Sequence, residues 1–170
     1  AAKTQIESII RRCSREMGST EDETNVEIYL SGPANFRYQL AKITPYKANR
    51  ADPPVHYQAL RDYLTQRWHA VVVSGMEADD RVSIRMRELE ADGQTACLAT
   101  IDKDLDQVPG LHYGYQDHVF YVIDKWDAEW AFWVQVLAGD ATDSIQGCYR
   151  TGVGTAQKLL AKWLEEFGDP

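Results

Sequence analysis

The sequence predicts an α/β fold in which a mostly parallel central sheet is flanked by helices. Two continuous apolar runs, "AVVVS" (70–74) and "TACLAT" (95–100), have the composition of strands buried on both faces. The stretch between them, "EADDRVSIRMRELEADG" (77–93), has helical periodicity. Buried strands that alternate with helices are typical of parallel sheets. The 170 residues, 44% of them hydrophobic, are enough for one domain with its own core.

The first third of the chain predicts a helix, a strand and a second helix. Ile6, Ile9, Cys13 and Met17 recur at helical spacing, which predicts an amphipathic helix over residues 3–17. The elements expected after it are a strand at 25–31, a turn leading into a short helix within 32–43, and a polar, proline-rich loop at 44–54.

The remaining two thirds alternate helices with strands. Gly93 follows the helix over 77–93, in the position of a C-terminal cap. The other elements expected here are a helix at 55–68, strands at 70–74, 95–100 and 118–123, and helices at 127–139 and 154–167.

Composition restricts the class of protein. The sequence contains no run of 18 apolar residues and no N-terminal signal pattern, which argues against a membrane protein. Its three cysteines form no CxxC pair, which argues against a disulfide scaffold and favours a reducing, intracellular setting in the cytoplasm. The net charge of −8 gives no simple basic footprint for nucleic acid. Bound metal ions would neutralise part of that charge.

Acidic residues cluster where three predicted elements end. Glu77 and Asp80 follow the strand 70–74, whereas Asp102 and Asp104 follow the strand 95–100. A further pair, Asp140 and Asp143, follows the helix 127–139. Ligands of parallel α/β sheets bind outside the carboxyl ends of the strands, so we expect the first two clusters to meet there and the third to join them.

Carboxylate oxygens are the ligands preferred by Mg²⁺ and Mn²⁺. Two such ions roughly 4 Å apart can hold a phosphodiester during hydrolysis. Each cluster alone has a structural explanation: acids in a first helical turn complement the helix dipole, and the other two clusters suit a solvated turn and an N-cap. With Asp79, which precedes Asp80, the clusters contain seven acids, which predicts a two-metal site.

An ordered set of motifs resembles the 5′→3′ exonuclease and flap endonuclease family, particularly its phage and bacterial members. The motifs are "YKANR", "EADD", "TIDKDLDQV", "LAGDATDSIQG" and "GVGTAQKLL". They occur in family order and the resemblance spans residues 36–160. The resemblance implies a resolvase-like catalytic domain over 1–142 with an arch or clamp region, and a DNA-binding helix-hairpin-helix segment over 143–170.

The resemblance implies a divalent-metal nuclease that acts on 5′ ends, nicks or flaps of DNA and leaves a 5′-phosphate and a 3′-hydroxyl. RNA paired to DNA is a further implied substrate. Two Mg²⁺ or Mn²⁺ ions are the implied cofactors. By position, the first metal site would comprise Glu77, Asp79, Asp80 and Asp102, and the second Asp104, Asp140 and Asp143.

The resemblance also assigns roles to cationic and aromatic residues. Lys47 and Arg50 of "YKANR" would contact the scissile phosphate, where a long cationic side chain can neutralise charge in the transition state. Arg37 is a further candidate for DNA contact, and Tyr46 for stacking on a base. Arg81 is equally compatible with DNA contact and with a structural ion pair.

The segment "GVGTAQKLL" resembles the second half of a helix-hairpin-helix. Gly152 and Gly154 would let the backbone approach a phosphate, next to the helix N-terminus that bears Thr155 and Lys158. Such a segment binds duplex phosphates without reading sequence. The resemblance implies a potassium ion in this hairpin.

Two departures from the family leave an alternative open. The family begins with a strand that bears a metal-binding aspartate, whereas this sequence opens on the predicted helix. Ser31 or Gly32 stands near a position that is often acidic. A catalytically weakened DNA-binding protein of the same fold is therefore the alternative. A metal-dependent ribonuclease of the PIN-like type is a further alternative. It needs neither "YKANR" nor a helix-hairpin-helix, so the presence of these two segments argues against it.

Overall fold

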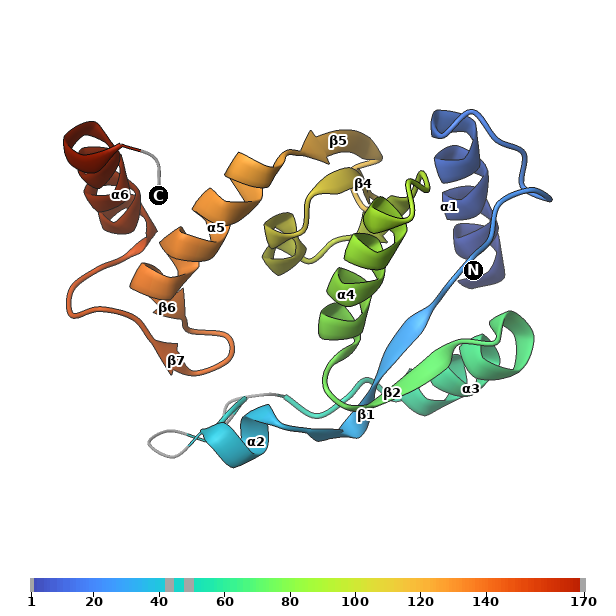
Figure 1. Cartoon of the computed structure of the whole chain (residues 1–170). Helices are drawn as coiled ribbons and strands as arrows, with labels where there is room; N and C mark the ends of the chain where they lie inside the picture. The colour runs from blue at the N-terminus through green and yellow to red at the C-terminus, as the bar shows by residue number, and fades with distance from the viewer. Residues whose placement is uncertain (1, 42–44, 48–50, 169–170) are drawn as a thin grey trace.

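The computed structural model describes residues 2–41, 45–47 and 51–168, and confirms a mixed α/β fold (Figure 1). The first helix, α1, and the last, α6, lie on opposite sides of the molecule. In chain order the elements are α1 (Ala2–Glu16), β1 (Tyr29–Asn35), α2 (Arg37–Leu40), α3 (Tyr57–Trp68), β2 (Val71–Gly75), α4 (Ala78–Ala91), β3 (Cys97–Thr100), the 3-10 helix η1 (Lys103–Gln107), β4 (Gly110–Gly114), β5 (Val119–Ile123), α5 (Lys125–Ala138), β6 (Gly139–Asp140), β7 (Ile145–Gln146) and α6 (Val153–Phe167).

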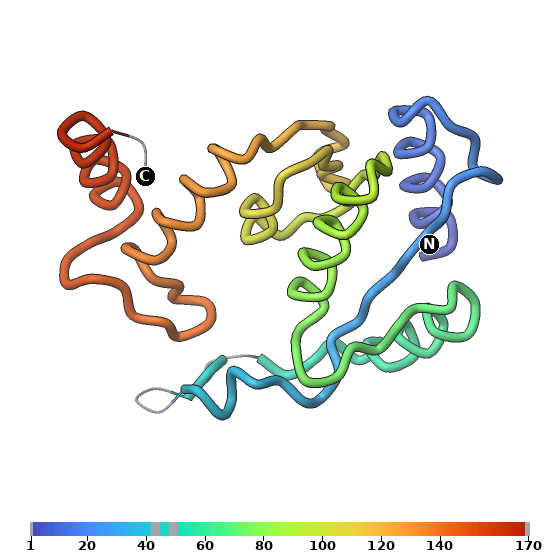
Figure 2. Tube along the Cα trace, in the orientation of Figure 1, coloured from blue at the N-terminus to red at the C-terminus, as the bar shows by residue number. Residues whose placement is uncertain are grey.

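The prediction of one mostly parallel central sheet is only partly confirmed, because the described strands form three separate sheets. β1 and β2 form a parallel pair, and β3 pairs in parallel with β4. β4 and β5 are antiparallel, as are the two short strands β6 and β7. Figure 2 shows the chain passing from the β1–β2 pair through α4 to the second sheet. Both predicted parallel strands, β2 and β3, are present, but they belong to different sheets.

Strand β4 was not predicted, although it is the middle strand of its sheet. Its sequence "GLHYG" has a glycine at each end and a histidine at its centre, which hides the apolar pattern of a buried strand. His112 and Tyr113 are nevertheless fully buried. The His112 ring is hydrogen-bonded through Nε2 to the carbonyl oxygen of Val108 at 2.8 Å.

The expectation that β2 is buried on both faces is also wrong. Val73 is 8% exposed, but Val71 and Val72 are 54% and 47% exposed. The reason is the split sheet: β2 lies in a two-stranded pair and not in the interior of a wide sheet, so its side chains are not covered on both faces.

Strand β1 begins at Tyr29, four residues later than predicted. Tyr29 is the first residue in register with β2, where it pairs with Val71. The preceding segment is held by one backbone bond, from the Val71 N–H to the Ile28 carbonyl oxygen at 2.8 Å, and by the Arg85 guanidinium, which lies 2.9 Å from the Glu27 carboxylate. This contact joins the segment before β1 to α4.

The hydrophobic core fixes α4 against the second sheet. Met86 of α4, Leu98 of β3, Leu105 of η1 and Val108 form one buried cluster. Burying such side chains contributes roughly 1.5–3 kcal/mol each. Gly110, the first residue of β4, has a φ of +135°, a backbone conformation that favours glycine, and an added Cβ would lie 2.9 Å from the Met86 methyl group. The cluster positions the start of α4 relative to η1.

The helices agree closely with the sequence predictions. α1, α3, α4, α5 and α6 begin and end within two residues of the expected bounds. Gly93 follows the C-terminus of α4 with a φ of +67°, as expected of a capping glycine. None of the helices in the described part of the chain combines the length and apolar character that a membrane span requires.

Candidate active site

Six of the seven predicted acids line one cavity of about 730 Å³. They come from three segments: the start of α4, the 3-10 helix η1, and the β6–β7 hairpin. The six are Glu77, Asp79, Asp80, Asp104, Asp140 and Asp143. Asp102 does not line the cavity; it is exposed and its carboxylate accepts a hydrogen bond from the Asp104 backbone N–H at 3.0 Å. The predicted convergence of three acidic segments is thus present for all but one residue.

The start of α4 forms one wall of the cavity. Glu77 is the N-cap residue and only 7% exposed. Its backbone N–H donates to Asp80 Oδ2 at 2.9 Å, and the N–H of Ala78 donates to Ser31 Oγ at 2.9 Å. These acids therefore have the local structural role of a helix start in addition to the predicted metal role.

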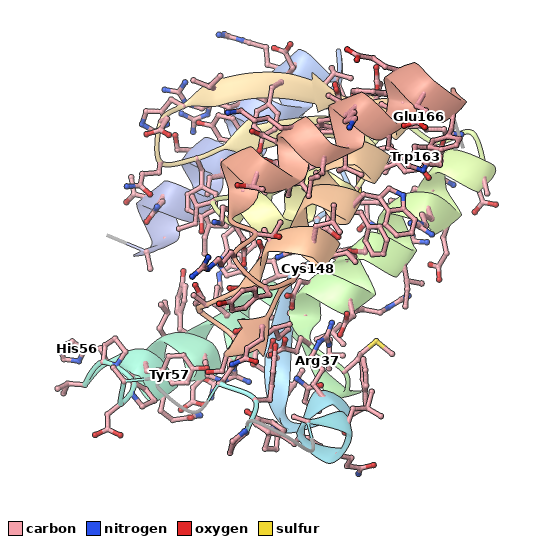
Figure 3. The ribbon with its side chains drawn as sticks, turned by 90° about the vertical axis from the view of Figure 1, so that its left-hand side faces the viewer. Arg37, His56, Tyr57, Cys148, Trp163 and Glu166 are labelled. Atoms are coloured by element: carbon pink, nitrogen blue, oxygen red, sulfur yellow. The ribbon has the colours of Figure 1, made fainter. Side chains whose placement is uncertain are left out.

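Arg37 neutralises Asp80. Its two terminal nitrogens lie 2.5 and 2.7 Å from the two Asp80 oxygens, in a bidentate pair. This hydrogen-bonded guanidinium holds the pKa of Asp80 below its usual range and the pKa of Arg37 above its own. Arg37, which was predicted to contact DNA, is thus bound to a predicted metal ligand; Figure 3 shows Arg37 near the lower end of α4.

Tyr46 and Lys47 lie between two acidic segments. The Tyr46 hydroxyl is 2.6 Å from Glu77 Oε2 and 2.5 Å from Asp143 Oδ2. Lys47 Nζ is 2.6 Å from Glu77 Oε1 and 3.8 Å from Asp143 Oδ1. Burial, followed by its hydrogen bonds to Asp143 and Glu77, raises the pKa of Tyr46. Arg50, the other predicted catalytic cation, lies outside the described residues.

The burial of Tyr46 bears on one prediction. Only 7% of this residue is exposed, and its ring packs edge-on against Tyr38 with centroids 5.6 Å apart. Stacking on a base needs an open ring face. Tyr46 is therefore a hydrogen-bond donor to carboxylates, and its burial argues against the predicted stacking on a base.

The opposite wall carries acids without a cationic partner in the described ion pairs. Asp104 accepts a hydrogen bond from Gln135 Nε2 at 3.1 Å, and Asp140 accepts one from the Thr142 N–H at 2.8 Å. Burial raises the pKa of Asp104, and the nearby charges of Asp102 and Asp140 raise it further. Negative charge on this wall is thus incompletely compensated.

The donor set fits a hard divalent cation in type. All six acidic ligand candidates are carboxylates that face one cavity, and such oxygens suit Mg²⁺ and Mn²⁺. Within residues 2–41, 45–47 and 51–168, however, no three Asp, Glu, His or Cys side chains lie close enough together to hold one ion. Cations and hydrogen-bond donors of the chain instead occupy several of these oxygens.

The remaining candidates lie away from the cavity. Arg81 pairs with Glu88 at 3.1 Å, which favours the structural explanation for that residue. Gly152 is the N-cap of α6. Gly152, Gly154, Thr155 and Lys158 are all exposed at the start of that helix, and none lines the cavity. In Figure 3, Trp163 and Glu166 of α6 lie at the end of the view opposite Arg37.

Sequence reasoning missed Gln135 and left Ser31 unresolved. Gln135 is the one amide in the apolar helix segment "WAFWVQVLAG", and this isolated polar residue was the available signal. Of the two positions near an expected acid, Gly32 has no room for a side chain, since an added Cβ would lie 2.3 Å from the Val73 carbonyl oxygen. Ser31 accepts the hydrogen bond from Ala78 described above.

Sequence comparison identifies relatives but no matching family model. DNA polymerase I of Rhizobium leguminosarum is 32% identical over 138 residues, which cover 73% of this chain and 13% of that protein. The thermostable DNA polymerase I of Thermus thermophilus is 30% identical over 151 residues, which cover 81% of this chain and 18% of that protein. The chain therefore spans less than a fifth of the length of either relative.

Solved structures share the fold. The bacteriophage T5 5′-exonuclease with bound zinc ions matches with a TM-score of 0.71 and 18% identity, over 99% of this chain and 68% of that one. The T5 D15 flap endonuclease, solved in a complex with DNA and metal ions, matches with a TM-score of 0.63 and 19% identity, over 98% of this chain and 65% of that one.

Proposed function

Because the chain belongs to the 5′→3′ exonuclease and flap endonuclease family, we propose that it is a divalent-metal-dependent nuclease that hydrolyses phosphodiesters at 5′ ends, nicks or flaps of DNA. The products would be a 5′-phosphate and a 3′-hydroxyl, and RNA paired to DNA would be a further substrate. The observation that supports the proposal most strongly is the convergence of six carboxylates from three segments on one cavity that also contains Arg37. The structural role of acids at a helix start accounts for the acids of α4, but not for those of η1 and the β6–β7 hairpin.

Two groups of residues would hold the ions, Mg²⁺ or Mn²⁺. As the family resemblance implies, Glu77, Asp79, Asp80 and Asp102 would hold one ion, and Asp104, Asp140 and Asp143 would hold the other. Bound ions would supply charge neutralisation of the phosphodiester and an acidified water. Carboxylates alone would repel a phosphate, so DNA could bind next to these acids only if bound cations neutralised part of their negative charge.

The chain's own cations would bind the reacting phosphate. The Lys47 side chain lies at the cavity wall, where its Nζ is 2.6 Å from Glu77 Oε1. Its ammonium group would neutralise charge that develops on the phosphate oxygens. Arg50 would act alongside it, as the family resemblance implies. Both cations would position the scissile phosphate against the acidic wall.

The start of α6 would hold the duplex beyond the cut. Gly152, Gly154, Thr155 and Lys158 are exposed, and the first backbone N–H groups of a helix favour an anion such as a phosphate. Contacts of this kind position DNA without reading its sequence. The potassium ion that the family resemblance implies would bind in the same hairpin.

The test is cleavage of a 5′-flap duplex with Mg²⁺ or Mn²⁺ by the wild type and by Asp104→Asn. We expect the substitution to slow cleavage by roughly a hundredfold or more, because it removes a charged candidate ligand while keeping its shape. Asp106→Asn is the matched control: Asp106 lies two residues away and accepts a hydrogen bond from the Tyr121 hydroxyl at 3.0 Å instead of lining the cavity. Equal rates for the two variants would contradict the proposal.

A catalytically weakened DNA-binding protein is the second candidate. It is favoured by one observation: near a position where the family often has an acid, Ser31 accepts a hydrogen bond from the start of α4. In that case the wild type binds the flap duplex tightly, but neither Mg²⁺ nor Mn²⁺ produces a cut. The same assay therefore separates the two candidates.

A further inference from the structure

We infer that Lys47 and Tyr46 compete with a divalent cation for Glu77 and Asp143, so that metal binding releases Lys47 from the acidic wall. The inference rests on the proposed metal-dependent function and adds to it an order of events. In the metal-free protein, the lysine proposed to bind the phosphate is engaged elsewhere. Metal binding makes it available.

The contacts leave few free oxygens on the two carboxylates. Glu77 Oε1 faces Lys47 Nζ at 2.6 Å, and Glu77 Oε2 faces the Tyr46 hydroxyl at 2.6 Å. The same two groups face Asp143: Lys47 Nζ lies 3.8 Å from Oδ1, and the Tyr46 hydroxyl 2.5 Å from Oδ2. All four carboxylate oxygens thus have a proton donor or a cation as their neighbour.

Burial strengthens these contacts. The side chains of Lys47 and Glu77 are 16% and 9% exposed, and Tyr46 is 7% exposed. Water competes little with a hydrogen bond in such surroundings, and charge-assisted bonds are the stronger kind. A metal ion that needs these oxygens must therefore displace the donors.

The backbone at Lys47 indicates that its position depends on the contacts. Its φ is +54°, in the left-handed region, which costs a residue with a side chain about 1 kcal/mol or more. The Lys47 N–H also donates to the Asp143 carbonyl oxygen at 3.3 Å. Once the ammonium group loses Glu77, less remains to hold this conformation, and the side chain is free to meet a phosphate.

The opposite wall provides the internal contrast. Asp104 and Asp140 accept hydrogen bonds from an amide and a backbone N–H, and no described ion pair includes them. A cation that binds only there has no lysine to displace. Competition is thus specific to an ion that uses Glu77 or Asp143.

The test measures Mn²⁺ binding to the whole chain without DNA, by titration with detection of free Mn²⁺ by electron paramagnetic resonance. Linkage requires that removing a competitor tighten metal binding. We expect Lys47→Met to lower the Mn²⁺ dissociation constant by about fivefold or more. Tyr46→Phe, which keeps the ring and changes no charge, should lower it in the same direction by a smaller factor.

Lys125→Met is the matched control. Lys125 also lines the cavity, but its ammonium pairs with Glu90 at 3.0 Å and is largely exposed. Its removal changes the net charge by the same amount as Lys47→Met. We expect its Mn²⁺ affinity to stay within about twofold of the wild type, because the lost charge is exposed and screened.

Unchanged or weaker Mn²⁺ binding in both Lys47→Met and Tyr46→Phe would overturn the inference. If Lys47→Met does not fold, Tyr46→Phe decides alone. A wild type that binds and uses Mn²⁺ for cleavage, with no tightening in the variants, refutes only the competition. A wild type that binds no Mn²⁺ and cuts no DNA refutes the proposed function itself.

Discussion

Single residues in the cavity perform two tasks, and Glu77 is the clearest example. It begins α4 as the N-cap residue and also faces Lys47 and Tyr46. A substitution at Glu77 therefore changes folding and the site together. Lys47 is the better residue for a kinetic test, because it belongs to no helix or strand.

We predict that Lys47→Ala slows cleavage of a 5′-flap by roughly a hundredfold but changes the dissociation constant for that DNA by less than about fivefold. The reason is that the ammonium group acts on charge that develops in the transition state. Single-turnover rates and equilibrium binding, measured on the same substrate, check the prediction. Lys158→Ala on α6 should show the opposite pattern, with weaker binding and a smaller loss of rate. Equal losses in rate and affinity for Lys47→Ala would contradict a transition-state role.

Residue types at strand ends were predictable from the sequence, but their partners were not. The acidic clusters stand out in the sequence, and six of the seven acids meet in one cavity. That Arg37 would pair with Asp80 and that Tyr46 would be buried against carboxylates depend on long-range packing. No local pattern in one sequence contains that information. Whether the acids hold metal stays a prediction.

At the scale of elements, the start of α4 depends on a hydroxyl from a different strand. Ser31 Oγ accepts the hydrogen bond from Ala78, in the manner of a helix cap supplied from outside the helix. We predict that Ser31→Ala lowers the free energy of unfolding by about 1 kcal/mol. Urea unfolding monitored by circular dichroism checks this value.

Ser83→Ala is the control for that measurement. The Ser83 hydroxyl donates to the Asp79 carbonyl within α4 at 2.7 Å, a bond that does not stabilise a helix. Its loss should change the unfolding free energy by less than about 0.5 kcal/mol. If the Ser31→Ala protein is as stable as the Ser83→Ala protein, the prediction is contradicted, because water then replaces the Ser31 hydroxyl as the acceptor for the Ala78 N–H.

The link between α4 and the segment before β1 predicts a pH dependence. Its hydrogen bonds with Arg85 hold the pKa of Glu27 below its ordinary value of 4.5. A lowered carboxyl pKa stabilises the fold above the unfolded pKa, and that contribution is lost as pH falls through the folded pKa. We predict that Glu27→Gln lowers the midpoint of thermal unfolding by about 2 °C at neutral pH.

The same difference in midpoint should disappear once the pH is below the folded pKa of Glu27, because the wild-type side chain is then neutral too. Calorimetry at neutral and acidic pH checks both halves of the prediction. Glu21→Gln, which removes the partner of the more exposed Arg11, should give a smaller shift at neutral pH. A difference that persists unchanged in acid would exclude the ion pair as its cause.

At the scale of the whole molecule, the sequence predicted the helices and most strands but not how the strands pair. Apolar runs identify β2 and β3, yet pairing in one sheet or in two is decided by contacts between distant segments. β4 was missed because glycines and a buried histidine interrupt its pattern. The fold class was therefore predictable, and the division into separate sheets was not.

Net charge leads to a further whole-molecule prediction. The chain has a net charge of −8, so the proposed binding of DNA must depend on local cations that neutralise phosphates. With about four such contacts, affinity for a duplex should fall roughly a hundredfold between about 50 and 200 mM salt. Fluorescence anisotropy of a labelled duplex with the Asp104→Asn variant checks this dependence. A flat response would exclude binding through the DNA backbone, whereas Lys158→Ala should reduce the slope by about one unit.

The division into separate sheets has a mechanical consequence for the acidic cavity. Its two walls are attached to different strand ladders, and the Tyr46 hydroxyl links them by facing Glu77 on one side and Asp143 on the other. No backbone ladder runs from one wall to the other, so their spacing is set by side-chain packing in the buried cluster of Met86, Leu98, Leu105 and Val108. In a site built on one continuous sheet, hydrogen bonds between strands would set this spacing, whereas here the fit of apolar side chains sets it.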